Sequence, residues 1–274
     1  MDIGNRGRLP VPLKYYAAHT GRWGGSDNVN LQNIPRNSVL KQAIQAPRGF
    51  VIVNSDSSQI EARVLAWLAG QNNLVEAFAN GDDVYKMMAS KIFLKDIRDI
   101  NKEERFVGKT TILGCGYGMG AKKFSNQLKA FGMLVDVERC KKIVYTYRKA
   151  VPFIPQFWRH AQDGLEAIIQ GKYLQITKQK QALDIIPNVG FDLPNKLQLR
   201  YPDLKKEQDS SGEYYYSYKS KKDRINIYGG KVVENICQAV ARCVIGEQML
   251  RVAKRYKVVM TVHDAVTCIA PEQE

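Results

Sequence analysis

The chain has 274 residues, which is enough to bury a substantial core in one large domain or in two joined ones. Its 41 Lys and Arg residues outnumber its 27 Asp and Glu residues by 14. Such an excess favours nucleic acid as a partner, because neutralised phosphates release counterions and give sequence-independent affinity. No uncharged apolar stretch approaches the roughly 18 residues of a membrane-spanning helix, and the N-terminal segment does not look like a secretory signal.

The five cysteines form neither a metal-binding nor a disulfide pattern. They include no C-x-x-C pair, and only three histidines could join them as ligands. We therefore expect reduced cysteines in a cytoplasmic protein. Any bound metal should be a hard cation held by oxygen.

Residues 1–48 are rich in Gly, Pro and Asn and predict loops and short strands with a basic surface. An apolar run at 49–54 predicts a strand, and the apolar spacing over 59–69 predicts a helix. Asp56 therefore falls at a strand-to-helix junction, where a side chain can face a cleft.

The middle of the chain predicts a mainly helical lobe over residues 72–172. Strand-like runs follow at 175–177, 196–201 and 214–218. The charged runs at 205–209 and 219–224 predict solvated hairpin ends, with contact to nucleic acid as the alternative. A long helix is predicted over 231–256.

Two runs rich in β-branched residues, within 258–269, flank the pair His263-Asp264 and predict a hairpin with a two-residue turn. Asp264 would lie at its tip. Asp56 and Asp264 are then two carboxylates at strand ends, which can hold two divalent metals about 3.5 to 4 Å apart for phosphoryl transfer.

Four side chains spaced four residues apart predict one face of a helix: Arg105, Lys109, Leu113 and Tyr117. Two cations, an apolar surface and a ring fit a nucleoside triphosphate lying along the helix. The alternative is an ordinary exposed stripe with a half-buried tyrosine.

Two glycine patterns do not fit familiar phosphate sites. Glu103 occupies the position where a phosphate loop ending in Gly108-Lys109-Thr110 needs glycine, and Met119 replaces the third glycine of a dinucleotide motif. We expect the glycines at 114–120 to end the helix and to let a base or a duplex approach Tyr117.

Two further polar residues keep open interpretations from position alone. Glu61 could be a third metal ligand, a surface charge paired with Arg63, or a wall of the nucleotide pocket. His263 could contact a phosphate or a primer terminus, or act as a structural donor.

Four ordered elements resemble those of the family A DNA polymerases, which include bacterial DNA polymerase I and many phage replicases. Thr20-Gly21-Arg22 with Asn30-Leu31-Gln32-Asn33-Ile34-Pro35 is similar to the family's primer-template element. The other three are Asp56-Ser57-Ser58-Gln59-Ile60-Glu61, similar to motif A; Arg105, Lys109 and Tyr117-Gly118, similar to motif B; and Val262-His263-Asp264, similar to motif C.

The resemblance implies two Mg²⁺ ions, for which Mn²⁺ can substitute, bound by Asp56, Asp264 and the carbonyl of Ser57. The catalytic residues would be the two aspartates and Lys109. The implied nucleotide-binding residues are Arg105, Lys109, Leu113, Tyr117, Gln59 and Glu61, and Glu61 would exclude a ribose 2′-OH. The implied DNA-binding residues are Arg22, Gln32, Asn33, His263, Glu234, Asn235 and Gln238.

The implied fold is α/β (α+β), DNA polymerase I-like. It has an antiparallel-sheet palm, residues 1–71 and 173–274, and a mostly helical fingers insertion, residues 72–172. Relative to the family, the chain begins where the palm begins and stops just after motif C. We therefore expect a truncated core without thumb or exonuclease domain, to which a separate polypeptide could supply either.

Three positions depart from the family pattern. Ala265 stands where motif C usually has Glu, Leu113 where an aromatic residue often contacts the incoming sugar, and Ser57 where Tyr is usual. Ser57 matters little if only its carbonyl binds metal. Ala265 and Leu113 could lower activity or alter sugar discrimination without removing the two carboxylates.

The implied function is template-directed addition of deoxynucleotides to a primer 3′-OH during DNA replication. Its partners would be primer-template DNA and deoxynucleoside triphosphates in the cytoplasm of a bacterium or a phage-infected host. One alternative is a non-catalytic or split DNA-binding subunit of a replicase, which Ala265 favours. A single-subunit RNA polymerase is the other, and Gln59-Ile60-Glu61 argues against it.

Overall fold

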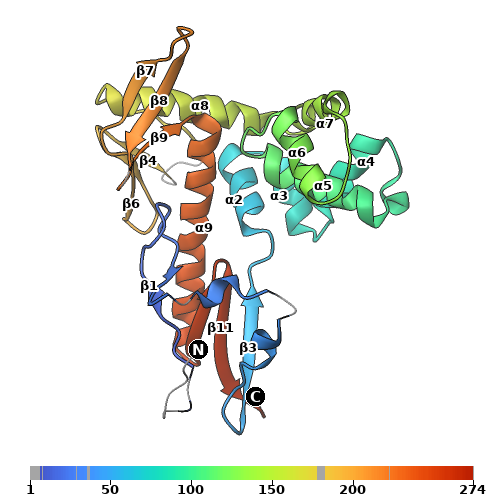
Figure 1. The fold of residues 1–274 in the computed structure, drawn as a ribbon, viewed down its shortest axis with the longest axis vertical. Helices are drawn as coiled ribbons and strands as arrows, with labels where there is room; N and C mark the ends of the chain where they lie inside the picture. Colours follow the sequence, from blue (N-terminus) through green and yellow to red (C-terminus); the bar gives the residue numbers. More distant parts are fainter. Residues whose placement is uncertain are drawn as a thin grey trace. The chain divides into compact units, whose positions relative to one another are not determined.

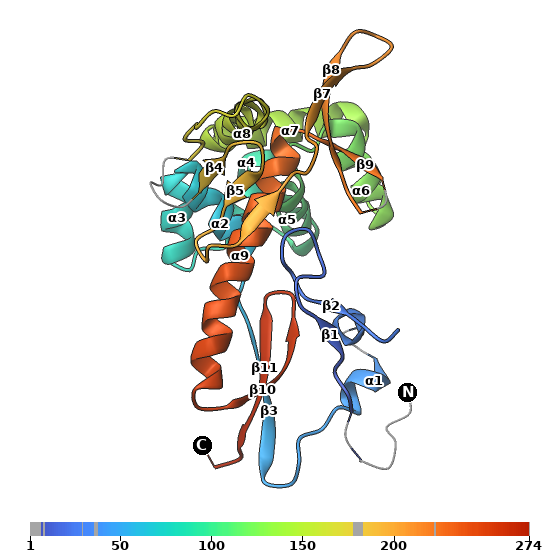
Figure 2. The same ribbon diagram turned by 90° about the vertical axis from the view of Figure 1, so that its left-hand side faces the viewer.

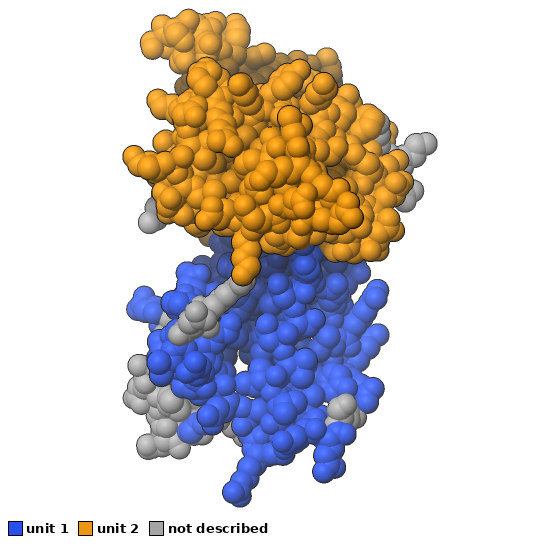
Figure 3. All heavy atoms as spheres, turned by 90° about the vertical axis from the view of Figure 1, so that its right-hand side faces the viewer, with its two compact units in different colours: residues 1–60, 238–274 blue, residues 61–237 orange. Residues whose placement is uncertain are grey.

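The computed structural model describes residues 7, 9–28, 30–35, 38–177, 183–221 and 223–273. The chain divides into two compact units (Figure 3). Unit 1 comprises residues 1–60 and 238–274, and unit 2 comprises residues 61–237. The palm and fingers boundaries at 71/72 and 172/173 stay a prediction.

Unit 1 is built on a three-stranded antiparallel sheet in the order β10-β11-β3 (Figures 1 and 2). Its strands are β3 (Phe50–Asp56), β10 (Lys257–Val262) and β11 (Ala265–Pro271). β10 and β11 form the predicted hairpin, with His263 and Asp264 as the turn. The register pairs Ala265 with Asp56 at one end of the sheet and Pro271 with Phe50 at the other.

The N-terminal part of unit 1 contains short elements, as its Gly- and Pro-rich sequence predicts. These are β1 (Leu13–Lys14), which pairs with β2 (Gly24–Gly25), the 3-10 helix η2 (Leu31–Asn33) and α1 (Val39–Gln42). Gln32 anchors η2 to the sheet, because its Nε2 donates to the carbonyl of Thr261 at 3.1 Å.

Helices dominate the first part of unit 2 (Figure 1), which confirms the predicted helical region. They are α2 (Ile60–Ala69), whose first residue belongs to unit 1, α3 (Asn72–Ala79), α4 (Val84–Phe93), η3 (Ile97–Asp99), α5 (Lys102–Cys115), α6 (Ala121–Ala130), α7 (Val137–Ala150) and α8 (Phe153–Ile169). Polar caps explain several starts: Asp83 caps α4, Asp136 caps α7, and Asn101 with Glu104 forms a capping box on α5.

A close helix crossing holds α5 against α4 at Gly108. A Cβ built on Gly108 would lie 2.1 Å from the carbonyl oxygen of Tyr85 and 3.0 Å from the amide nitrogen of Ala89. Only a residue without a side chain allows the two backbones to approach this closely.

Two three-stranded antiparallel sheets follow in unit 2. One contains β4 (Asp184–Ile186), β5 (Gly190–Asp192) and β6 (Gln198–Arg200). The other contains β7 (Lys205–Gln208), β8 (Tyr214–Lys219) and β9 (Arg224–Ile227). Phe191 of β5 and Ile185 of β4 lie beside Gly164 of α8, so that the first sheet packs on that helix.

Two sequence expectations in this region are wrong. Residues 175–177 form no strand, since the side chain of Gln175 instead bonds locally to the carbonyl of Thr177. Of the charged run at 205–209, residues 205–208 form the edge strand β7, and only Asp209 lies in the hairpin turn that follows. Charged side chains are common on edge strands, where they face water and discourage further pairing. The run at 219–224 does contain a turn, between β8 and β9.

The long helix α9 (Gly229–Ala253) confirms the prediction within a few residues. Its residues up to Cys237 belong to unit 2, and those from Gln238 onward belong to unit 1. All five cysteines are free and buried. None of the helices in the described part of the chain has the length and apolar character needed to cross a membrane.

A polar cluster links α8 to the second sheet and predicts an acid-sensitive part of the stability. Glu166 accepts hydrogen bonds from the Tyr216 hydroxyl and the Lys206 ammonium, which hold the pKa of its carboxyl below the ordinary value. Because the folded-state pKa is lowered, this stabilisation is present above the ordinary carboxyl pKa and is lost as the pH falls through the lowered one.

We expect Tyr216→Phe to reduce the free energy of unfolding by about 1 kcal/mol at pH 7, since the bond is charge-assisted but partly exposed. Urea titrations should show the difference shrinking as the pH falls below the ordinary carboxyl pKa and through the lowered one. Tyr214→Phe, which alters an exposed tyrosine of the same strand, is the matched control. A difference that stayed constant with pH would contradict this account.

Candidate active site

The two aspartates lie at the same end of the unit 1 sheet. Asp56 ends β3 opposite Ala265, and the amide of Ser57 donates to the carbonyl of Asp264 at 2.9 Å. Asp56 is exposed and Asp264 is half-buried. The fold thus brings the end of β3 and the β10-β11 turn, which are far apart in the sequence, to the same end of one sheet.

Unusual backbone conformations flank both aspartates. His263 and Gln59 have positive φ angles, 54° and 58°, in the left-handed region that residues other than glycine seldom adopt. The side-chain oxygen of Gln59 is also buried, and it has no hydrogen-bond partner among the described residues. Strain and unpaired polar atoms of this kind concentrate at functional sites.

The donors at this sheet end suit a hard divalent cation. They are the carboxylates of Asp56 and Asp264 and the carbonyl of Ser57, all oxygen ligands. No cluster of three or more His, Cys, Asp or Glu side chains that could hold a metal occurs within the described residues. One or two carboxylates completed by substrate phosphates is the arrangement that Mg²⁺ commonly uses. The residues therefore fit Mg²⁺.

The structure shows the surroundings of Ser57 and Ala265, two of the three residues that differ from the family pattern. The Ser57 hydroxyl donates to Oε1 of Gln248 at 2.8 Å, so this side chain ties the end of β3 to α9 within unit 1. Ala265 is buried and pairs with Asp56, and its carbonyl accepts from the Thr261 hydroxyl. Neither side chain adds a carboxylate to the sheet end.

Several predicted DNA-binding residues meet in a small pocket of unit 1. Arg22, Gln32 and His263 line it together with Arg242, a residue that the sequence analysis missed. Arg242 donates to the carbonyl of Gly21 at 3.1 Å, and its guanidinium lies over the Tyr15 ring. Only tertiary packing brings Arg242 to this place, and no local pattern distinguishes it from the other cations of a long helix.

The remaining predicted DNA-binding residues are distributed over both units. Asn33 is exposed in η2, and Gln238 accepts a long bond from the Thr20 hydroxyl, 3.4 Å. In unit 2, Glu234 pairs with Lys231 at 2.9 Å, and the buried Asn235 donates to the Tyr201 hydroxyl at 3.2 Å. Contact of these residues with DNA stays a prediction.

In unit 2, Arg105, Lys109 and Leu113 lie on the solvent-facing side of α5, as their spacing predicts. Lys109 is exposed, and Leu113 is 39 % exposed. Gly108, Lys109 and Thr110 are all helical, in agreement with the rejection of a phosphate loop. Tyr117 corrects the predicted helix, because α5 ends at Cys115 and the chain turns through Gly118, which has a φ of 83°.

Arg105 is held in place by residues that precede and begin α4. Its Nε donates to Oδ2 of Asp83 at 2.6 Å, and its guanidinium lies 5.3 Å from the centre of the Tyr85 ring. Burial alone would raise the pKa of Asp83, but the hydrogen bonds from Arg105 and from the Lys86 amide hold it below its ordinary value. The bond through Nε leaves the two terminal nitrogens of the guanidinium for other acceptors.

Tyr117 belongs to a half-buried polar cluster in unit 2. Burial raises the pKa of its hydroxyl well above the ordinary value, and Cys237, Glu61 and Glu234 raise it further. The phenol therefore remains neutral and can donate a hydrogen bond. Glu61 lies near enough to influence Tyr117, which is consistent with a role as a wall of the predicted nucleotide pocket.

Comparison with known proteins agrees with this architecture. Residues 4–274 match the sequence profile of DNA polymerase family A, and the chain belongs to this family. The DNA polymerase of Bacillus phage SP02 is 32% identical over 304 aligned positions, which cover 94% of this chain and 46% of the phage protein. The thermostable DNA polymerase I of Thermus thermophilus is 36% identical over 169 positions, 60% of this chain and 18% of that protein. The chain spans less than half the length of these relatives.

A solved structure shows the same fold. The POL domain of Pol1 from M. smegmatis, in complex with DNA primer-template and dNTP, aligns with a TM-score of 0.65 and 22% identity. The alignment covers 98% of this chain and 43% of that one. The expected mixed α/β fold with antiparallel sheets and a helical region is therefore confirmed.

Proposed function

We propose that this chain is the palm-and-fingers core of a DNA polymerase that adds deoxynucleotides to a primer 3′-OH in DNA replication. The observation that carries the proposal is that Asp56, the last residue of β3, and Asp264, in the β10-β11 turn, lie at the same end of one sheet. Membership of family A supports the class of reaction. Primer-template DNA and deoxynucleoside triphosphates would be the ligands.

Asp56, Asp264 and the Ser57 carbonyl would hold two Mg²⁺ ions, or Mn²⁺ in their place. When bound, such ions lower the pKa of an attacking hydroxyl and neutralise the triphosphate and its leaving group. Strand pairing fixes the backbone of Asp56, and the bond from the Ser57 amide fixes that of Asp264 in the turn, so little reorganisation is needed at the site.

Arg105 and Lys109 would hold the triphosphate. The Asp83 carboxylate orients Arg105 through Nε, which preserves the terminal guanidinium nitrogens for a two-point contact with phosphate oxygens. Lys109 has no ion-pair partner among the described residues and carries a compact charge on the same helix face. Leu113 would pack against the sugar, and Tyr117 would contribute a neutral phenol near the base.

Glu61 would select deoxyribose by excluding a 2′-OH, and Gln59 precedes it with a buried, unpaired amide oxygen that a ligand donor could use. We expect Glu61→Ala to raise ribonucleotide incorporation relative to deoxynucleotide incorporation by about tenfold or more, the usual consequence of removing a specificity contact. Glu138→Ala, at an exposed position of α7, is the control. An unchanged ratio of the two incorporation rates would refute the assignment.

Arg22, Asn33, His263 and the newly found Arg242 would contact primer-template, with Gln32 and Gln238 holding the surrounding segments together. Glu234 and Asn235 are the remaining candidates. The net positive charge supplies sequence-independent affinity. The affinity for DNA should therefore fall steeply as the salt concentration rises. Base choice would come from the geometry of base pairing.

The direct test is primer extension with Mg²⁺, together with a separate measurement of DNA binding. Template-dependent extension with deoxynucleotides supports the proposal. Tight DNA binding without extension, alone and with a polypeptide that supplies a thumb, would favour the second candidate, a non-catalytic or split replicase subunit. Ala265 is the observation that favours that candidate, because the usual third acidic side chain is missing. Extension with ribonucleotides only would indicate an RNA polymerase.

A further inference from the structure

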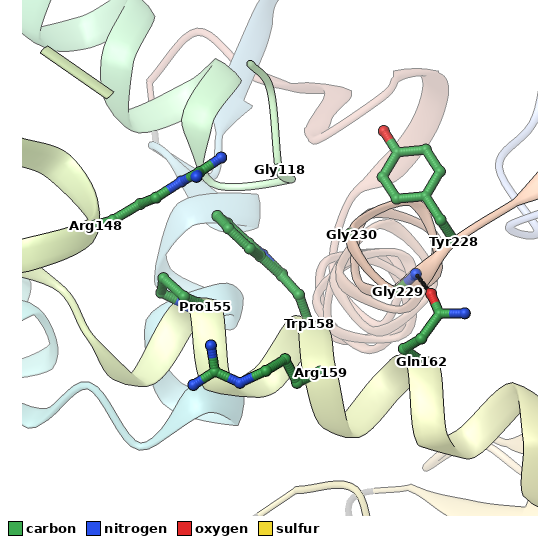
Figure 4. A pocket seen from close by; sticks show the side chains of 9 residues that line it. All are labelled: Gly118, Arg148, Pro155, Trp158, Arg159, Gln162, Tyr228, Gly229 and Gly230. Carbon is green, nitrogen blue, oxygen red and sulfur yellow. Dashed lines mark hydrogen bonds between the residues drawn. The ribbon is translucent and has the colours of Figure 1, made fainter. Parts of the chain in front are cut away.

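Unit 2 contains a pocket that the proposed chemistry does not use. It has a volume of about 390 Å³, within the range of small-molecule sites. Its lining comes from the loop after α5, from α7 and α8 and from the start of α9 (Figure 4). The lining residues are Gly118, Arg148, Pro155, Trp158, Arg159, Gln162, Tyr228, Gly229 and Gly230.

Two aromatic rings lie on opposite sides of this pocket (Figure 4). Trp158 is held in place because its Nε1 donates to the carbonyl of Gly116 at 2.8 Å and because the Arg148 guanidinium lies 5.7 Å from its ring. Tyr228 is 50 % exposed. A fixed indole and an accessible phenol ring offer flat faces on which a nucleobase can stack.

Glycines let the segments that frame the pocket approach one another closely. A Cβ on Gly229 would lie 2.0 Å from the carbonyl oxygen of Trp158, and a Cβ on Gly230 would lie 2.5 Å from that of Tyr117. The start of α9 therefore approaches both segments backbone to backbone. A Cβ on Gly118, whose φ is 83°, would lie 3.7 Å from the Tyr228 ring.

The charge of the pocket is positive and uncompensated. Arg148 and Arg159 both line it and are exposed, and neither has an acidic partner within 4.0 Å among the described residues. Cations left without counter-charges beside aromatic faces match the two parts of a nucleotide, the phosphate and the base. An apolar ligand would leave both guanidinium groups unused.

We propose that this pocket binds one unpaired nucleotide, with its base against Trp158 and Tyr228 and its phosphate at Arg148 and Arg159. The nucleotide could belong to a single-stranded nucleic acid or be free in solution, because the chemistry is the same. The first source rests on the proposed function, since a polymerase meets single-stranded template. The binding itself does not depend on nucleotide addition.

The test compares three labelled probes in fluorescence anisotropy: a duplex with a long single-stranded 5′ overhang, a blunt duplex of the same sequence, and dAMP carrying a fluorophore. Arg159→Gln and Tyr228→Ala are the pocket variants, both at exposed positions where folding should persist. Lys149→Gln and Tyr145→Ala, exposed residues of α7 outside the pocket lining, are the matched controls.

We expect each pocket variant to weaken binding of the overhang duplex by about tenfold, the usual loss when a stacking or phosphate contact is removed. Blunt-duplex binding and both controls should stay near wild type. Weaker binding of labelled dAMP, with overhang binding unchanged, would support the pocket and identify free nucleotide as its source. If neither overhang nor dAMP binding changes, the proposal is wrong. None of the probes is extended in this test. It therefore measures binding to the pocket whether or not the chain polymerises DNA.

Discussion

Asp56→Asn and Asp264→Asn should each reduce the rate of nucleotide addition by about 1,000-fold or more, while duplex binding changes little. Each substitution keeps the side-chain volume and removes one of the two negative charges at the end of the β10-β11-β3 sheet. Losing a charge that holds a catalytic metal removes several kcal/mol of transition-state stabilisation. Single-turnover primer extension measures the rate, and anisotropy measures DNA binding in parallel.

Glu272→Gln provides the matched control for these variants. It removes a carboxylate just after β11, at the end of the sheet where Pro271 pairs with Phe50, away from Asp56 and Asp264. Its extension rate should equal that of the wild type. Normal extension by either aspartate variant would show that the two carboxylates are not the catalytic pair.

Gly108→Ala should destabilise unit 2 by about 3 kcal/mol, because the new methyl group would collide with the backbone of Tyr85. In an open helix the same change would stabilise by up to about 1 kcal/mol. Gly246→Ala supplies that comparison in α9, since its Cβ would only touch the far end of the Arg242 side chain at 3.6 Å.

The two glycine variants are therefore expected to have opposite signs. Urea unfolding followed by circular dichroism gives the free energy of unfolding for each. Gly108 is the neighbour of Lys109, a proposed phosphate ligand, so unfolding of this variant would also lower its activity. The activities of the two variants should therefore be compared only at temperatures where both are folded. Equal stability of Gly108→Ala and the wild type would mean that α4 and α5 do not cross as closely as described.

Local patterns were sufficient to predict the elements that carry the aspartates. The β-branched runs around His263 and Asp264 predict the hairpin because strand period and turn length are properties of neighbouring residues. The face shared by Arg105 and Lys109 follows in the same way from helical spacing. Assignment of the sheet-end pair to metal binding used the resemblance to a known family as well.

Features set by distant contacts could not be predicted. Lys205–Gln208 forms a strand because β8 pairs with it. The sequence of this segment shows a run of charged residues and no strand pattern. Asp83 reads as an ordinary helix cap, and nothing around it indicates that Arg105, 22 residues later, will bind it. Arg242 and Trp158 likewise acquire their neighbours only when separate helices and loops pack together.

Asp83 caps helix α4 and also binds Arg105, so it couples the local stability of α4 to the order of the proposed phosphate ligand. The same carboxylate accepts from the amides of Tyr85 and Lys86 at the start of α4 and from Arg105, the proposed phosphate ligand. A change that frays the first turn of α4 would also release the guanidinium, so local unfolding and substrate affinity should vary together. Because its pKa is lowered, Asp83 keeps its charge, and with it both sets of bonds, into mildly acidic solution. Hydrogen exchange of the Tyr85 and Lys86 amides would then report indirectly on how well the triphosphate site is ordered.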